Sequence, residues 1–105
     1  MYINTITPEE AKKMLDERED ITILDVRGEN EYREGHIKGS KSIPLEFLET
    51  NVEDEVPDKN STIFIYCQSG KKAKVGYEYL KELGYDNVYD MGGIMDWPYE
   101  IEVSF

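Results

Sequence analysis

A chain of 105 residues is long enough for one domain with a buried core and too short for two domains of ordinary size. Its 12 Lys and Arg residues against 23 Asp and Glu residues give a formal net charge of −11, which opposes binding to nucleic acids or to an anionic membrane surface. One cysteine excludes an intrachain disulfide, and one histidine with one cysteine cannot complete a Cys/His zinc site. The sequence therefore predicts no metal site.

The N-terminus, MYINTITPEEAKK, has no basic segment followed by an apolar stretch, so it does not resemble a secretory signal. No apolar run approaches the roughly 20 residues that a membrane-spanning helix needs. A single unpaired cysteine fits a reducing compartment. We therefore expect a soluble, unprocessed, cytoplasmic protein.

The first predicted element is a helix that begins at Pro8. Thr7 is a favourable cap, proline suits the first helical position, and Glu10 is placed to accept a hydrogen bond from the Thr7 amide, as in a capping box. Residues 21–26, ITILDV, follow this helix. Their nearly continuous apolar and β-branched character predicts a strand that is covered on both faces of a parallel sheet.

A second buried strand is predicted at residues 62–66, TIFIY. A helix is then expected from near Lys72 to Leu83, with Gly84 as a left-handed stop. The shorter predicted elements are a helix at 29–34, a strand around 42–43, a short helix from Leu45, an acidic loop at 49–61 and a strand at 87–89.

This alternation of strands and helices favours an α/β fold with a parallel sheet. In such sheets, ligands bind beyond the carboxyl ends of the strands. Asp25 ends the first buried strand and Cys67 directly follows the second. The two residues are therefore expected at the same edge of the sheet, which makes that edge the candidate site.

The loop after Cys67 reads QSGKK and has the features of an anion-binding turn. A chain that passes from a strand into a helix N-terminus directs several backbone N–H groups at one point, and the helix dipole adds positive potential there. Gly70 permits a positive φ, and Ser69 offers a hydroxyl. Lys71 and Lys72 add positive charge. The sequence thus predicts a loop that stabilises the thiolate of Cys67.

Several short motifs along the chain occur in the order and spacing of one known family. They are DVR at 25–27 followed by EY at 31–32, GHIKGS at 35–40 followed by IP at 43–44, the Cys67 loop, and GG at 92–93 followed by Trp97. On these motifs the chain resembles the rhodanese family, the thiosulfate sulfurtransferases and their single-domain relatives. The resemblance covers nearly the whole chain. It implies one rhodanese-like domain over residues 1–105, with an α/β fold of about five parallel strands flanked by helices on both faces.

The resemblance also implies an enzyme of the thiosulfate sulfurtransferase type, with Cys67 as the catalytic residue that carries a persulfide. Sulfane sulfur would pass from thiosulfate or a persulfide donor to cyanide or to a thiol, including the thiol of a partner protein. The backbone N–H groups from Gln68 to Lys72 are expected to hold the persulfide charge, and Lys71 and Lys72 to attract the anionic donor. No metal, organic cofactor, nucleic acid or membrane partner is expected.

Two alternatives remain open. The first is a thiol-based phosphatase or arsenate reductase. By resemblance, tyrosine-type phosphatases carry an arginine six residues after the cysteine, whereas this chain has Ala73 there and no second cysteine to resolve an arsenate intermediate. The second is a non-catalytic binding module of rhodanese fold, which the intact Cys67 disfavours.

Some residues outside the loop are predicted to support it. Asp25 is expected either to orient the cysteine loop through backbone N–H groups or to form the turn at the end of its strand. Arg27 is expected to form a local ion pair with Glu31. His36, within a Gly-His-Ile turn, is interpreted as structural rather than as a general base. The acidic residues between 46 and 58 are interpreted as a solvated segment, with the docking of a basic sulfur acceptor as the alternative.

Overall fold

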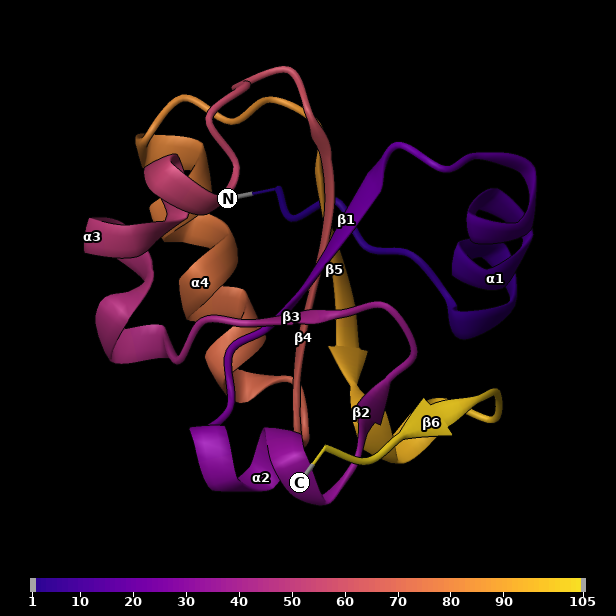
Figure 1. Ribbon diagram of the computed structural model, residues 1–105. Helices are drawn as coiled ribbons and strands as arrows, with labels where there is room; N and C mark the ends of the chain where they lie inside the picture. Colours follow the sequence, from indigo (N-terminus) through magenta and orange to yellow (C-terminus); the bar gives the residue numbers. More distant parts are fainter. Residues whose placement is uncertain (1, 105) are drawn as a thin grey trace.

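The centre of the molecule is a sheet of parallel strands, shown in Figure 1, a computed structural model that describes residues 2–104. Within these residues the sheet has four strands in the order β3 (Lys41–Ser42), β1 (Ile21–Asp25), β4 (Thr62–Cys67) and β5 (Val88–Gly93). A single parallel bridge from Thr5 to Asp90 adds to the outer edge of β5. The predicted α/β fold is therefore confirmed, with four full strands and one isolated bridge.

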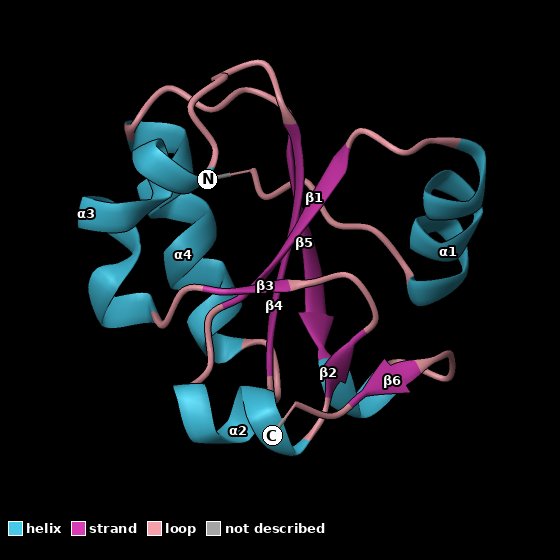
Figure 2. Cartoon of the chain, in the orientation of Figure 1, coloured by secondary structure: helices cyan, strands magenta, loops and turns pink. Residues whose placement is uncertain are grey.

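Helices cover both faces of this sheet (Figure 2). The helices α3 (Leu45–Glu55) and α4 (Lys71–Glu82) lie on one face, and α1 (Pro8–Glu17) lies on the other. The short helix α2 (Glu29–Glu34) lies near the carboxyl ends of β1 and β4. All six residues of β4 are buried, as the apolar run in the sequence predicted.

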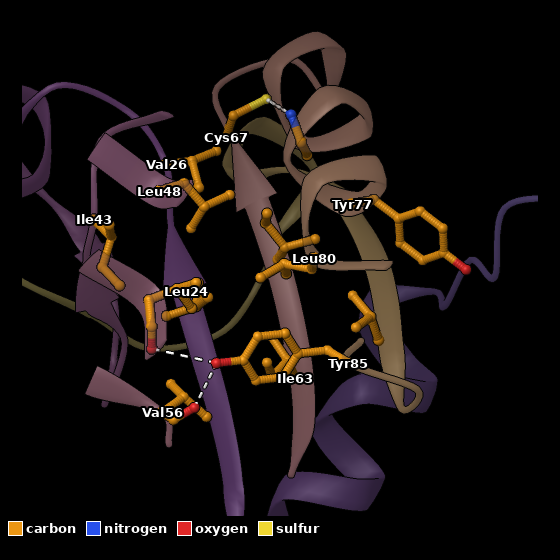
Figure 3. Packing of buried hydrophobic residues seen from close by; sticks show 14 residues of the cluster. Leu24, Val26, Ile43, Leu48, Val56, Ile63, Cys67, Tyr77, Leu80 and Tyr85 are labelled. Atoms are coloured by element: carbon orange, nitrogen blue, oxygen red, sulfur yellow. Dashed lines mark hydrogen bonds between the residues drawn. The ribbon is translucent and has the colours of Figure 1, made fainter. Parts of the chain in front are cut away.

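The larger part of the core lies between the sheet and the helices α3 and α4 (Figure 3). Leu24 of the sheet, Leu48 of α3 and Leu80 of α4 are fully buried there. A Cβ atom at Gly76 would lie 2.5 Å from Cδ1 of Ile65. Glycine at this position therefore lets α4 pack closely against β4, and this packing helps to position the N-terminus of α4 beside Cys67.

A second cluster lies between the sheet and α1, around Phe64 and Ala11. The predicted capping box at the start of α1 is present: Thr7 Oγ1 accepts from the Glu10 N–H at 3.1 Å, and Glu10 Oε1 accepts from the Thr7 N–H at 3.0 Å. The N-terminus of α1 is thus fixed by local hydrogen bonds.

The acidic segment after Leu45 differs from the sequence prediction. Residues 49–55 were expected to be loop, but α3 continues to Glu55. The reason is that Leu48 and Val52, four residues apart, are both fully buried and give the segment an apolar helical face. The carboxylates occupy the remaining face, so the prediction of a loop over these residues is wrong.

The C-terminal part of the chain also contains elements that the sequence did not predict. Strand β5 continues to Gly93 and leads into a 3-10 helix, η1 (Ile94–Asp96). The strand β6 (Ile101–Glu102) then pairs antiparallel with β2 (His36–Ile37). No helix within residues 2–104 is long and apolar enough to cross a bilayer.

Candidate active site

Cys67 is the last residue of β4, and only 2% of its surface is exposed. Its Sγ atom accepts hydrogen bonds from two backbone N–H groups, those of Gly70 at 3.0 Å and Ala73 at 3.3 Å (Figure 3 draws one of these contacts as a dashed line at Cys67). Backbone N–H groups directed at one sulfur favour its anionic form. The loop therefore has the geometry of an anion cradle around the thiol.

Gly70 sets the direction of the chain at this point. It lies at φ +104°, in the left-handed region that favours glycine, and directly precedes α4. Because α4 begins at Lys71, its first N–H groups and the positive end of its dipole lie beside the sulfur. The sequence prediction for the conformation of Gly70 is confirmed.

Gly92 and Gly93, at the end of β5, pack against the cysteine loop. Gly93 is paired in register with Cys67. A Cβ atom at Gly93 would collide with the carbonyl oxygen of Gln68. The absence of a side chain at Gly93 therefore lets the backbone of β5 support the cysteine loop directly.

Asp25 and Arg27 form a buried ion pair beside the loop. The Asp25 carboxylate accepts from the Arg27 backbone N–H at 2.9 Å, from Nε at 3.1 Å and from Nη2 at 2.7 Å. Their side chains are 0% and 6% exposed. Burial opposes the charge of Arg27, but the hydrogen bonds and the charge of Asp25 outweigh it, so the pKa of the guanidinium is raised.

The two predictions about these residues are corrected by this geometry. Arg27 pairs with Asp25 rather than with Glu31, whose Oε1 accepts from the Gly28 N–H at 3.3 Å and caps α2. Asp25 contacts the backbone N–H of Arg27, two residues on, rather than N–H groups of the cysteine loop, so of its two predicted roles the geometry favours that of a turn former. Arg27 reaches that loop instead, through Nη1 at 3.4 Å from Gln68 Oε1.

A cavity of about 340 Å³ opens next to the sulfur. Its lining residues come from the cysteine loop, the first turn of α4, the β1–α2 connection and α2: Cys67, Gln68, Ser69, Lys71, Lys72, Arg27 and Glu31. The structure thus brings the predicted loop residues together around one space. Gly70 contributes its N–H from within the loop, and Asp25 lies behind Arg27.

A second cavity, of about 590 Å³, shares three lining residues with the first: Arg27, Glu31 and Gln68. Its remaining wall comes from Glu34 and Gly35 at the end of α2, from the segment after β5, including Met95, and from Ile101 of β6. The apolar part of this wall was not predicted from the sequence, because apolar residues scattered over a short C-terminal segment show no strand or helix period. The only available signal was Trp97, which was recognised as part of a motif without a role.

His36 lies apart from both cavities. Its ring is stacked on Tyr32 with centroids 3.8 Å apart, and its Nδ1 atom lies 2.8 Å from the Tyr32 carbonyl oxygen. Only 4% of the residue is exposed. These contacts agree with the structural role that the sequence analysis assigned to it.

Two further buried groups near the carboxyl edge have shifted pKa values. Burial raises the pKa of Tyr66, whose hydroxyl accepts from the Ile37 N–H at 3.1 Å. Burial also raises the pKa of Asp90, although the Gly92 N–H at 2.8 Å and the charge of Lys74 oppose the shift. Both groups hold backbone in place and lie outside the cavity at Cys67.

Within residues 2–104 no group of three or more His, Cys, Asp or Glu side chains is arranged to hold a metal ion. What the structure defines is a parallel α/β domain with one buried cysteine in a backbone N–H cradle at the carboxyl edge of its sheet. The chain belongs to the rhodanese family: the model of the rhodanese-like domain matches residues 7–99.

Curated proteins with similar sequences include the thiosulfate sulfurtransferase PspE of Escherichia coli, which is 37% identical over 73 residues, 70% of each chain. The thiosulfate sulfurtransferase GlpE of Pseudoalteromonas translucida is 32% identical over 92% of this chain and 90% of its own. The sulfur carrier protein YrkF of Bacillus subtilis, described as putative, is 33% identical over 90% of this chain, which spans about half, 51%, of that protein.

Solved structures show the same fold. A rhodanese-like domain protein from Staphylococcus aureus is 31% identical, with a TM-score of 0.81 over 98% of this chain and 100% of that one. A rhodanese from E. coli with bound anions is 32% identical, with a TM-score of 0.75 over 79% of this chain and 98% of that one.

Proposed function

We propose that this chain is a sulfurtransferase that moves sulfane sulfur from thiosulfate or a persulfide donor to cyanide or a thiol, through a persulfide on Cys67. The names of PspE and GlpE support this reaction class. The observation that carries the proposal is the pair of N–H groups, from Gly70 and Ala73, that point at Sγ of Cys67.

In the first half-reaction the Cys67 thiolate attacks the outer sulfur of thiosulfate. A bond forms between Sγ and that sulfur, the S–S bond of thiosulfate breaks, and sulfite leaves with the bonding electron pair. Cys67 then carries one added sulfur. Lys71 and Lys72 line the cavity and attract the dianionic donor, since among the described residues the only other cationic side chain in its wall is the ion-paired Arg27.

In the second half-reaction an acceptor attacks the terminal sulfur of the persulfide. The Sγ–S bond breaks, Cys67 leaves as a thiolate, and the acceptor becomes thiocyanate or a new persulfide. The N–H groups of Gly70 and Ala73 stabilise the leaving thiolate. We assign Gln68 and Ser69, both exposed at the cavity, to contacts with the transferred group.

Neither step needs a metal ion or an organic cofactor, because the cysteine supplies the nucleophile and the leaving group. The thiol must be reduced before it can attack a donor, so we place the protein in the reducing cytosol.

The test is the intact mass of the protein after incubation with thiosulfate and removal of the excess. The proposal expects the mass of one added sulfur, lost again on addition of cyanide with release of thiocyanate. Cys67→Ser should remain folded and gain no sulfur, because a serine cannot hold sulfane sulfur. A wild-type protein that gains no sulfur but hydrolyses aryl phosphates would overturn the proposal in favour of a thiol phosphatase.

A further inference from the structure

The larger cavity next to Cys67 combines apolar walls with an acidic rim. Ile94, Met95, Trp97 and Ile101 supply apolar surface, and Met95 is 71% exposed. The exposed carboxylates of Glu31 and Glu34 lie at the same cavity. Among residues 2–104 neither carboxylate forms a close ion pair, and the one cation in the wall, Arg27, forms its close ion pair with Asp25.

This cavity does not match the sulfur donor. A volume of about 590 Å³ is in the range of sites that hold a drug-sized molecule, whereas thiosulfate is a small dianion. The two carboxylates repel anions, and so does a chain with a net charge of −11. The lysines that attract the donor line the smaller cavity and are absent from the larger one.

The two cavities meet at Gln68, Arg27 and Glu31, so a group held in the larger one is adjacent to the sulfur. A segment with apolar side chains and positive charge would complement the wall and the rim. We propose that the larger cavity docks a basic, apolar, cysteine-containing segment of an acceptor protein and presents its thiol to the Cys67 persulfide. This inference rests on the proposed function and specifies its acceptor.

The transfer is balanced without a further reactant. The acceptor thiolate attacks the terminal sulfur of the Cys67 persulfide, a bond forms between the two sulfurs, and the bond to Sγ breaks. Cys67 regains its thiolate, and the acceptor carries the persulfide. Docking raises the effective concentration of the acceptor thiol at the sulfur.

Binding can be measured without any sulfur chemistry. Trp97 is the only tryptophan of the chain and lines the larger cavity, so its fluorescence reports occupancy. The probe is the pentapeptide Lys-Leu-Ser-Leu-Lys, with serine in place of the reactive cysteine, against the matched peptide Glu-Leu-Ser-Leu-Glu. The proposal expects a saturable change with the basic peptide, weakened by salt, and at least tenfold weaker binding of the acidic peptide.

Variants of one rim carboxylate make the test specific. Glu34→Gln should weaken binding of the basic peptide about two- to fivefold, the range of one exposed charge pair. Glu34→Lys should further reduce the preference for the basic peptide over the acidic one. The matched control is Glu46→Gln, which removes the same charge from an exposed residue of α3 that lines neither cavity. This control should bind both peptides as the wild type does.

The same variants are then assayed as enzymes, with the cysteine forms of both peptides and with cyanide as acceptors. Equal binding of the two peptides, or equal losses in Glu34→Gln and Glu46→Gln, would overturn the docking proposal. So would a Glu34→Gln variant that loses the cyanide and peptide reactions by the same factor. These results are distinct from a failure of the proposed function, which would appear as an absence of added sulfur on Cys67 in the wild type.

Discussion

The backbone N–H of Gly70 lies 3.0 Å from Sγ of Cys67, and Gly70 holds a left-handed φ of +104°. One residue therefore turns the chain from β4 into α4 and also directs an N–H group at the sulfur. An L-residue with a side chain strains this conformation. The sulfur cradle and the start of the helix thus depend on the same backbone torsion.

Replacing Gly70 with alanine should impair sulfur transfer. A Cβ atom there would lie 3.6 Å from the backbone of Gly92, which is an ordinary contact, so the left-handed torsion is the main source of strain. We expect a loss of about 1 to 2 kcal/mol in the free energy of unfolding and about a tenfold fall in the rate of persulfide formation, the equivalent of one weakened charge-assisted hydrogen bond. Urea unfolding and the rate of sulfur uptake measure the two effects.

The matched control is Gly84→Ala, because Gly84 has a similar φ of +97° and a Cβ atom added there would meet no non-neighbouring atom of the described residues within 4 Å. It lies just beyond the far end of α4, away from Cys67. The control should lose a similar amount of stability and keep its rate of sulfur uptake. Equal rate losses in both variants would show that the Gly70 effect is general strain rather than loss of the cradle.

Removing the charge of Asp25 should strongly destabilise the fold. Asp25→Asn leaves the Arg27 guanidinium buried without its counter-ion, and breaking a buried pair in this way costs about 3 to 5 kcal/mol. The free energy of unfolding of the variant, from urea titration at neutral pH, measures this loss. Asp20→Asn is the control, since Asp20 pairs with Arg18 at the surface, and its loss should be far smaller. Similar losses in the two variants would contradict the assigned role of the buried pair.

The sequence predicted the cysteine loop well because the relevant interactions there are local. The strand 62–66, Gly70 and the start of α4 lie within a dozen residues, and strand character, left-handed glycine and helix start each have a sequence signal. The capping box of Thr7 and Glu10 was predictable for the same reason. These local signals placed Cys67 between a strand end and a helix start, and the family resemblance made it the candidate nucleophile.

Contacts between distant segments were not predictable in the same way. Nothing in the sequence distinguishes Asp25 from Glu31 as the partner of Arg27, because both are near in sequence and only burial decides between them. The wall at Met95 and Ile101 depends on β6 pairing with β2, which is a contact between two strands of two residues each. Such short strands have too few residues to show an alternating pattern.

The charge of Asp90 should lower the free energy of unfolding at neutral pH, compared with a variant that has an uncharged side chain at position 90. Burial raises its pKa in the folded state above the ordinary value, so the folded chain binds more protons between those two values. Stability then falls as the pH rises through that window and stays low above it. Asp90→Asn keeps an oxygen for the Gly92 N–H and removes the charge. We expect the variant to be more stable than the wild type at pH 7, by an amount that shrinks as the pH falls below the raised pKa.

Urea unfolding of wild type and variant at a series of pH values between 3 and 7 measures this difference. Asp86→Asn, at an exposed position before β5, is the control and should differ far less from the wild type at pH 7. A difference for Asp90→Asn that is constant with pH would show that ionisation of this carboxyl does not penalise folding.

Lys72 should act on donor binding more than on turnover. Its side chain is exposed and lines the cavity at Cys67, where it attracts the anionic donor in the ground state and the transition state alike. Lys72→Ala should therefore raise the KM for thiosulfate by about three- to tenfold with little change in kcat, and the effect should shrink as salt is added. Lys72→Arg keeps the charge and should bind the donor at least as well as the wild type, since guanidinium forms bidentate contacts with oxyanions.

Lys74→Ala is the matched control, because Lys74 belongs to the same helix and has the same charge but does not line this cavity. If Lys72→Ala and Lys74→Ala changed the KM equally, the positive charge of the helix start as a whole, rather than a contact in the cavity, would account for donor binding.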